Sequence, residues 1–514
     1  MNNLAVANAL ALNDYALQTV VGGENSLDRV RKYAAGLPGV KRCLLLVPEG
    51  GKLAIPDLGF EVRHVKGEGV AELLRTFQSM LEEEEYDNLF YFFADCPLLD
   101  PGLSGGMLDN HRKYYADYTF ADGYPYGLSP EILKPDVLAP LLDLAEKSRL
   151  AAGEAGRAGE EPIRGRDRDA LFRLIRKDIN AFDVETELSP VDLRMLRAEL
   201  SADCKRNLLL LQRVVQAGAE DARGVCAVLQ KQPEMLRTLP SFFSIQIVEG
   251  CPQLCSYCPY PRFGISETGK QGQMELKDFG RILEQIHSFC AEATVSVSLW
   301  GESAYHGEFA DLALSVLERG LRLVVETSGI GWQDGVFARI AEGRHAGLEW
   351  VVSLDSRDPV EYKRLRGEGF EEANRNVETL QSLFPGHVYP QAVRMNENEE
   401  GLEDFYRYWK NKTGRVIVQK YDPFCGFLPD RRVTDLSPLK RFPCWHLKRD
   451  VSVLLDGRVS LCREDLECRH GLGNLLEQSL EEIWTAGEPF YRDHLEERYP
   501  ELCKNCDEYY SFNF

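Results

Sequence analysis

Three closely spaced cysteines constrain this chain more than any other feature of its sequence. Cys251, Cys255 and Cys258 have the spacing C-x3-C-x2-C. Three thiolates on one short loop can hold three irons of a [4Fe–4S] cluster and leave the fourth iron an open position, where a small molecule can bind. A structural zinc knuckle is one alternative, although zinc prefers four protein ligands and usually C-x2-C pairs. Unligated buried thiols are the other alternative, and the spacing favours the cluster over both.

The residues around this motif indicate where the cysteines lie in the fold. Residues 243–248 are largely apolar and predict a short buried strand, so the cysteines follow on the loop that leaves it. Tyr257, just before the third cysteine, is placed to shield a cluster. This arrangement resembles the radical S-adenosylmethionine (SAM) superfamily, whose cluster binds the methionine end of SAM and cleaves SAM reductively. The resemblance implies a [4Fe–4S] cluster and SAM as cofactors of this loop.

Five more candidate strands follow, separated by amphipathic stretches typical of helices. They span residues 295–300, 321–326, 348–354, 388–395 and 416–421. Together with the first strand they predict a β/α repeat with a parallel sheet. Such sheets place their chemistry at the carboxyl ends of the strands. The count does not support an eight-stranded barrel, and the resemblance implies a six-stranded (β/α)6 partial barrel.

Polar residues stand at the predicted strand ends. Trp300-Gly301-Glu302 resembles the Gly-Gly-Glu motif of the superfamily, with a tryptophan in place of the first glycine. Gly301 would let the backbone approach a ligand closely, and the resemblance implies that Glu302 accepts a hydrogen bond from the methionine ammonium. Thr327 and Ser328 occupy the position of the ribose contact. Capping of the next helix is the alternative for each of these side chains.

The next two strands end in further candidates for cofactor binding. Ser353 and Asp355 offer a hydroxyl and a carboxylate. Arg394 can form a bidentate pair with the SAM carboxylate; its alternative is a surface ion pair with one of the glutamates at 397, 399 and 400. Residues 362–367 look like the helix that follows the fourth strand in the superfamily, and we assign them no catalytic role.

A second cysteine group lies near the carboxyl terminus. Cys444 and Cys462 are spaced C-x17-C, and Cys503 and Cys506 are spaced C-x2-C. Asp456-Gly457 between apolar residues predicts a hairpin that brings the first pair together. From spacing alone, a four-cysteine zinc site competes with an iron–sulfur cluster.

The pattern C-x12-G-x4-C from residue 444 to 462, followed by L-G-N and L-E-E-I-W, resembles SPASM domains, which add auxiliary clusters to radical SAM enzymes. The chain ends eight residues beyond the last of these cysteines, as in the shortened twitch form. The resemblance implies a second [4Fe–4S] cluster, fully ligated by the four cysteines and used for electron transfer or positioning.

Two more cysteines have open roles. Cys425 follows the sixth predicted strand, so it lies near the mouth of the barrel and is the candidate catalytic thiol, either as a hydrogen-atom donor or as a substrate contact. The alternative is an inert thiol. Cys468, six residues past Cys462, could replace one of the auxiliary ligands.

The amino-terminal part reads as a separate α/β domain. Buried strands are predicted at 40–47 and 88–94, and Asp95 stands at the end of the second, where a divalent metal or a nucleotide could bind. The run D-C-P-L-L-D-P from Asp95, with A-D-G-Y-P-Y-G at 121–127, resembles sugar-cytidylyltransferases. Residues 5–28 contain no arginine or lysine, however, and a phosphate cradle without cations is weak. We therefore expect a degenerate nucleotidyltransferase-like domain.

Domain boundaries follow from these segments. We expect the nucleotidyltransferase-like domain at 1–203, a helical linker at 204–240, the radical SAM partial barrel at 241–430 and the SPASM or twitch domain at 431–514. A net charge of −21 argues against a general nucleic-acid binder. No apolar run reaches the roughly 20 residues that span a bilayer, so we expect a cytoplasmic protein whose fourteen cysteines are not disulfide-bonded.

Taken over nearly its whole length, the chain resembles the spiro-SPASM group of radical SAM/SPASM proteins. The resemblance implies reductive cleavage of SAM to a 5′-deoxyadenosyl radical, oxidative modification of a peptide or protein substrate, and a one-electron reductant such as flavodoxin or ferredoxin. Two alternatives remain: sugar nucleotidyltransferase activity in the amino-terminal domain, and a non-catalytic iron–sulfur or zinc-binding protein.

Overall fold

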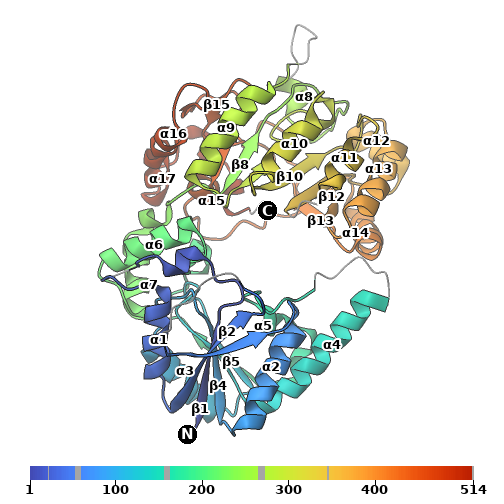
Figure 1. Cartoon of the computed structure of the whole chain (residues 1–514). Helices are drawn as coiled ribbons and strands as arrows, with labels where there is room; N and C mark the ends of the chain where they lie inside the picture. Colours follow the sequence, from blue (N-terminus) through green and yellow to red (C-terminus); the bar gives the residue numbers. More distant parts are fainter. Residues whose placement is uncertain (21, 52–58, 155–161, 264–271, 344–346, 512–514) are drawn as a thin grey trace. The chain divides into compact units, whose positions relative to one another are not determined.

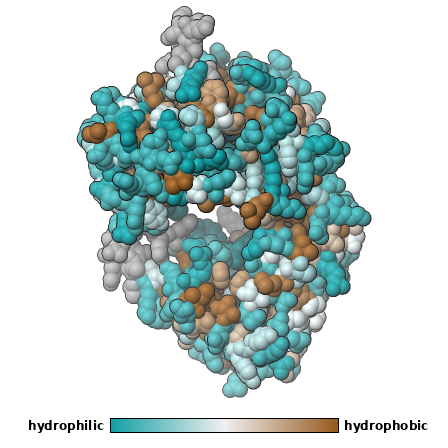
Figure 2. Space-filling model, turned by 180° about the vertical axis from the view of Figure 1, so that it is seen from behind, coloured by the Kyte–Doolittle hydropathy of each residue, from teal (hydrophilic) through white to brown (hydrophobic). Residues whose placement is uncertain are grey.

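The computed structural model of the chain describes residues 1–20, 22–51, 59–154, 162–263, 272–343 and 347–511. The chain forms two compact units, one made of Met1–Ala155 with Glu161–Thr238 and the other of Leu239–Phe514. Among the described helices, none has the length and apolar character needed to cross a membrane. On the face shown in Figure 2, hydrophilic side chains predominate and hydrophobic ones occur in small separate groups.

The first unit is a sheet between two layers of helices (Figure 1). Its strand order is β3-β2-β1-β4-β6-β5-β7, in which β6 runs antiparallel to β4 and β5 while the other pairs are parallel. The strands are β1 (Asn3–Asn8), β2 (Val40–Pro48), β3 (Glu61–Val65), β4 (Asn88–Phe93), β5 (Tyr118–Asp122), β6 (Glu131–Leu133) and β7 (Val184–Leu188).

Alternating side chains of the central strands build a core on each face of this sheet. From β1, Leu4 and Val6 pack with α2 (Val70–Glu83), α4 (Leu138–Glu154) and α5 (Ala170–Ile175). Ala5 and Ala7 pack on the other face with α1 (Ser26–Gly36) and α3 (Pro101–Lys113). The strands predicted at 40–47 and 88–94 are confirmed as β2 and β4, whereas β1, in the middle of the sheet, was not predicted as a strand.

The segment expected to be a linker is helical but packs into the first unit. Its helices are α6 (Lys205–Gln216) and α7 (Ala222–Lys231). Their leucines and valines share a core with Leu98, Leu128 and Leu200. The Asp100 carboxylate also accepts a hydrogen bond from Ala222 N at 2.6 Å, which fixes the start of α7 to the start of α3.

The second unit contains a nine-stranded sheet with the order β13-β12-β11-β10-β9-β8-β14-β15-β16. Strands β8 to β13 are all parallel and follow one another in chain order, green to orange in Figure 1. They are β8 (Phe242–Ile245), β9 (Thr294–Ser296), β10 (Arg322–Thr327), β11 (Leu348–Ser353), β12 (Val388–Arg394) and β13 (Ile417–Lys420). Each overlaps one of the six strands expected from the sequence.

Helices connect these parallel strands. They are α8 (Tyr260–Phe263), α9 (Leu276–Phe289), α10 (Phe309–Leu317), α11 (Val336–Glu342), α12 (Pro359–Arg366), α13 (Phe370–Leu383) and α14 (Glu399–Thr413). Because the strands are parallel, their carboxyl ends and the loops that follow lie at one edge of the sheet. The polar residues singled out in the sequence are the last residues of these strands or lie in the loops that follow.

The carboxyl-terminal segment extends the same sheet. The predicted hairpin is confirmed: β14 (Asp450–Val453) and β15 (Arg458–Ser460) are antiparallel, and Gly457 in the turn has a φ of 83°. β14 also runs parallel to β8, so the sheet continues past the boundary expected at residue 430. The remaining elements are α15 (Trp445–Arg449), β16 (Gly473–Asn474), α16 (Leu480–Ala486), α17 (Glu488–Leu495), α18 (Glu501–Lys504) and a short 3-10 helix, η7 (Glu508–Tyr510).

Candidate active site and metal centres

The first cysteine loop leaves β8 and docks on the end of α12. Leu254 N donates to Arg366 O at 3.1 Å, and Ser256 N donates to Leu365 O at 2.8 Å. A further backbone hydrogen bond of 3.1 Å closes a turn between the second and third cysteines. The loop therefore has a defined conformation that depends on a helix more than 100 residues later in the chain.

A buried ion pair lies beneath this loop. The Arg366 guanidinium donates to the Asp355 carboxylate at 2.7 Å, and both side chains are at most 5% exposed. Tyr257 OH contacts both of them, and Arg366 also donates to the Gln253 side chain at 3.2 Å. The second Asp355 oxygen accepts from Val393 N at 2.7 Å. These contacts tie the cysteine loop to the ends of β11 and β12.

Arg366 was missed by sequence reasoning. It lies in the segment 362–367, which was noticed but given no role. That segment carries two arginines, and no sequence signal distinguishes the buried one from Arg364, whose side chain is 58% exposed. Asp355 was expected at the cofactor, yet its oxygens are engaged by protein groups, so its contribution to cofactor binding stays a prediction.

The three thiols are close enough to affect one another's ionisation. Burial raises the pKa of Cys251 and Cys258 to about 12; the nearby Glu302 carboxylate adds to this at Cys251, and Cys255 adds to it at Cys258. Burial also raises the pKa of Cys255. Three protonated thiols gathered on one loop fit a metal site, because binding of a cationic metal is what makes such thiols ionise.

A second polar network joins the ends of β9 and β10. One oxygen of the Glu302 carboxylate accepts from the Thr327 hydroxyl at 2.6 Å, and the other accepts from Ser328 N at 2.7 Å. All three residues are at most 4% exposed. Burial raises the pKa of Glu302. The structure thus brings together three of the predicted cofactor-binding residues, beside Cys251.

The surrounding backbone leaves room only for a glycine at position 301. Its φ is 81°, and a Cβ at this position would collide with the backbone oxygen of Val248. The glycine was predicted to let the backbone approach a ligand closely. In the structure, the close approach is to the backbone segment between β8 and the cysteine loop. Trp300, which replaces the first glycine of the family motif, is 9% exposed and stacks on Tyr260 with ring centroids 6.3 Å apart. Its indole packs beside the cysteine loop.

Two predicted cofactor residues lie outside these networks. Ser353 Oγ accepts from the Gln391 side chain at 3.3 Å. Arg394 forms a two-pronged ion pair with Glu399, with distances of 2.8 and 2.6 Å. The structure therefore shows the alternative interpretation of Arg394, and its role toward SAM stays a prediction.

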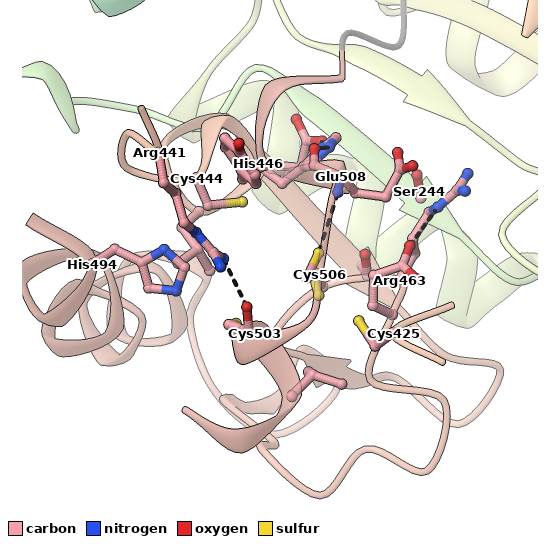
Figure 3. Close-up of a pocket in the computed structure, with 17 residues that line it drawn as sticks. Ser244, Cys425, Arg441, Cys444, His446, Arg463, His494, Cys503, Cys506 and Glu508 are labelled. Carbon is pink, nitrogen blue, oxygen red and sulfur yellow. Dashed lines mark hydrogen bonds and ion pairs between the residues drawn. The ribbon is translucent and has the colours of Figure 1, made fainter. Parts of the chain in front are cut away.

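The second cysteine group converges on one cavity (Figure 3). Cys444 precedes α15, Cys462 follows β15, and Cys503 and Cys506 lie in and just after α18. Burial raises the pKa of Cys503 to about 12, and burial likewise raises the pKa of Cys444 and Cys462. The four residues predicted as auxiliary ligands are thus brought together.

Some polar atoms beside this cavity have no hydrogen-bond partner among the residues that the structure describes. Both ring nitrogens of His494 are buried without a hydrogen-bond partner, and the residue is 2% exposed. Burial and the nearby Arg441 lower the pKa of His494 to about 4, so the ring is neutral. Glu508 N donates to Cys506 Sγ at 3.4 Å. An N–H directed at a thiolate and an orphaned imidazole fit a cluster, whose sulfurs accept hydrogen bonds.

Cys425 also lines this cavity. The sequence placed it near the barrel mouth as a catalytic candidate; in the structure its sulfur points toward that of Cys506 (Figure 3). The interaction between the two thiols raises the pKa of Cys425 and lowers the pKa of Cys506. Cys468, the other ambiguous cysteine, does not line the cavity. All fourteen cysteines are described, and none forms a disulfide.

The candidate metal or nucleotide residue of the first unit is already paired. Asp95 accepts from both terminal nitrogens of Arg168, at 3.1 and 2.9 Å. Arg168 also pairs with Asp203 at 3.2 Å and lies over the Tyr126 ring. Because both carboxylate oxygens accept from this guanidinium, binding of a metal or nucleotide by Asp95 stays a prediction. An aromatic cavity of about 300 Å³ adjoins Arg168.

Two family models match the second unit. Residues 245–408 match the radical SAM superfamily, and residues 444–507 match the SPASM iron–sulfur cluster-binding domain. An uncharacterised protein of Treponema pallidum (strain Nichols) is 38% identical over 360 residues, which is 67% of this chain and 98% of the relative.

Solved structures give weaker likenesses. SuiB of Streptococcus suis, solved with its precursor peptide SuiA, is 16% identical and aligns over 56% of this chain and 74% of its own, with a TM-score of 0.41. A cytidylyltransferase from Leptospira borgpetersenii is 14% identical over 46% of this chain and 95% of its own, with a TM-score of 0.35. Scores this low leave the family assignment to the family models and the relative.

The ranges of the two models include both cysteine groups, and the cofactors of the chain are a [4Fe–4S] cluster with SAM in the radical SAM domain and an iron–sulfur cluster in the SPASM domain. The chain is an enzyme: it belongs to the radical SAM superfamily and carries a carboxyl-terminal SPASM domain.

Proposed function

We propose that Cys251, Cys255 and Cys258 ligate the SAM-binding cluster of a (β/α)6 partial barrel and that the enzyme oxidatively modifies a peptide or protein. The observation that carries the proposal is the gathering of three half-buried, mutually interacting thiols on a loop beside Glu302, at the carboxyl ends of parallel strands. When bound, the cluster and SAM supply a one-electron cleavage that yields methionine and a 5′-deoxyadenosyl radical.

The residues of the chain hold and orient these groups. Three thiolates leave one coordination position for SAM. Glu302 already accepts three hydrogen bonds, from Thr327, Ser328 and Ala304, and a carboxylate has a further lone pair with which to accept one from the methionine ammonium. Asp355 and Arg366 keep the loop in place from below, and Tyr257 bridges them to the cysteines.

Apolar side chains exclude water from the cysteines. Trp300, Tyr260 and Leu299 are each at most 9% exposed and form one apolar cluster against which Cys251 and Cys258 pack. A radical generated in such a site is protected from solvent.

The SPASM domain supports the substrate class. The cavity holds four cysteines, enough to ligate a cluster completely, which suits an electron acceptor rather than a substrate-binding iron. An electron taken from a substrate radical gives a net oxidation, and many SPASM proteins act on peptides or proteins. The first cluster requires a one-electron reductant, such as a flavodoxin or ferredoxin.

The cleavage step is tested by 5′-deoxyadenosine formation from SAM and dithionite under anaerobic conditions. We expect Cys255→Ala to abolish the product. Cys290→Ala, which removes a buried thiol at the end of α9, is the matched control and should retain it. Equal product from the Cys255→Ala and wild-type proteins would contradict the ligand assignment.

The substrate class is tested separately with candidate peptides. A true substrate should accelerate 5′-deoxyadenosine formation. Because the modification is an oxidation, the mass of the peptide should fall by that of an even number of hydrogen atoms. Peptide-independent turnover with every candidate, together with unchanged peptide masses, would argue against a peptide substrate while leaving SAM cleavage intact.

A further inference from the structure

Five thiols, not four, line the auxiliary cavity. Cys425 lies there with the four predicted ligands, next to Cys506. Figure 3 shows the two sulfurs facing each other. A [4Fe–4S] cluster takes four thiolates. The cavity therefore contains one thiol more than its cluster needs.

The backbone around Cys425 is held in an uncommon conformation. Phe424 and Cys425 have φ values of 50° and 54°, and Gly426 follows with 88°. Non-glycine residues rarely adopt this left-handed region and persist in it where the surrounding structure imposes it. Here the conformation directs the Cys425 thiol into the cavity while Phe424 packs against Trp300, with ring centroids 5.8 Å apart.

The same short segment contacts both cysteine groups. Phe424 belongs to the apolar cluster that includes Cys251 and Cys258. Cys425, the next residue, contacts Cys506 of the other group. A change of ligand at Cys425 would therefore shift a side chain that packs beside the SAM-binding loop.

We propose that Cys425 and Cys506 form one exchangeable ligand position, so that either thiolate can bind the fourth iron of the auxiliary cluster. In the exchange, the bond from iron to Cys506 sulfur breaks and a bond to Cys425 sulfur forms. The proton of the Cys425 thiol passes to the neighbouring Cys506 sulfur as it leaves the iron. No electron is gained or lost, and no other reactant is needed. The inference rests on ligation of the auxiliary cluster by the carboxyl-terminal cysteines.

The test counts iron at the auxiliary site alone. All variants are made in a Cys251→Ala/Cys255→Ala/Cys258→Ala background, reconstituted anaerobically with iron and sulfide, and compared with that parent. We expect Cys506→Ala to keep the parent's iron content because Cys425 replaces the missing ligand. Cys425→Ala/Cys506→Ala should lose most of it.

Two matched controls show that the rescue is specific. Cys468→Ala/Cys506→Ala removes a thiol outside the cavity and should keep its iron. Cys444→Ala should lose iron whether or not Cys425 is present, because the contact of Cys425 is with Cys506. The proposal is overturned when Cys506→Ala loses as much iron as the double variant, or when the double variant keeps its iron. A parent without auxiliary iron would instead refute ligation by the cysteine quartet.

A second measurement applies if Cys506→Ala does not fold, as judged by circular dichroism. The electron paramagnetic resonance spectrum of the reduced auxiliary cluster is then compared between the parent and Cys425→Ala, which retains the whole quartet. Two ligand states should give two overlapping signals in the parent and one in Cys425→Ala. Identical spectra would overturn the exchange.

Discussion

Replacement of Arg366 by methionine should destabilise the second unit strongly. The substitution keeps much of the side-chain length but removes the cation that pairs with Asp355 at 2.7 Å, where the two side chains are 5% and 0% exposed. Breaking a buried ion pair by removing one partner costs about 3–5 kcal/mol, because the other charge is left buried and uncompensated. The same substitution should loosen the cysteine loop, whose Tyr257 and Gln253 lose a hydrogen-bond partner.

Tryptophan fluorescence can follow this unit by itself. All six tryptophans of the chain lie between residues 300 and 484, within the second unit. Urea unfolding of the full-length apo protein, monitored by this signal, gives the change in free energy of unfolding. Arg364→Met is the matched control: its pair with Glu361 is an exposed i,i+3 contact, so we expect less than about 1 kcal/mol.

A double-mutant cycle gives the sharper result. Asp355→Asn/Arg366→Met leaves no unpaired buried charge, so it should be less destabilised than the sum of the two single variants. If Arg366→Met costs no more than Arg364→Met, or if the double variant equals the sum of the singles, the ion pair does not support the loop as argued.

Three further predictions concern other parts of the chain. Gly301→Ala should destabilise the second unit by about 1–3 kcal/mol, because it adds backbone strain and a clash with Val248 O. Its control, Gly280→Ala, lies in open space on helix α9 and should stabilise the unit by about 0.5–1 kcal/mol. Urea unfolding measures both changes in free energy. Burial raises the pKa of Glu131 from its ordinary value of 4.5 to about 7. Between pH 4.5 and pH 7 the folded state therefore binds more protons than the unfolded state. The stability of the first unit should fall as the pH rises through that window. Thermal unfolding of Glu131→Gln should lack this fall, and a wild-type stability that rises from pH 5 to 8 relative to the variant would contradict the assignment. His494→Phe removes an N–H donor beside the auxiliary cluster and should lower its midpoint potential by roughly 20–60 mV, the equivalent of one hydrogen bond; an unchanged potential would mean that the imidazole does not bond to the cluster.

The sequence predicts the elements of this chain whose cause is local. The six parallel strands are short apolar runs separated by amphipathic helices, and the hairpin at 456–457 has an Asp-Gly turn. The spacing of the cysteines in each group is enough to predict them as candidate cluster ligands. By contrast, β1 is rich in alanine, which is at least as typical of a helix, and only its position between β2 and β4 makes it a strand.

Residues whose role depends on partners far away in the chain could not be predicted from the sequence. Arg366 lies next to Asp355 and Tyr257 only after α12 has packed on the cysteine loop. Cys425 meets Cys506 across 81 residues of chain, so its position after the sixth strand suggested the barrel mouth instead. Arg394 illustrates the opposite case: its pairing with Glu399 was one of the alternatives that the sequence offered, and the structure shows it.

Iron counting combined with SAM cleavage tests the central claim most directly. The wild-type protein, the variant with Cys251, Cys255 and Cys258 replaced by Ala, and the variant with Cys444, Cys462, Cys503 and Cys506 replaced by Ala are reconstituted in parallel. Each is assayed for iron per chain and for 5′-deoxyadenosine. We expect about eight irons and product from the wild type, and about four irons without product from the triplet variant. Formation of 5′-deoxyadenosine by the triplet variant would contradict the account. So would a wild-type protein that has a full and reducible first cluster but forms no 5′-deoxyadenosine.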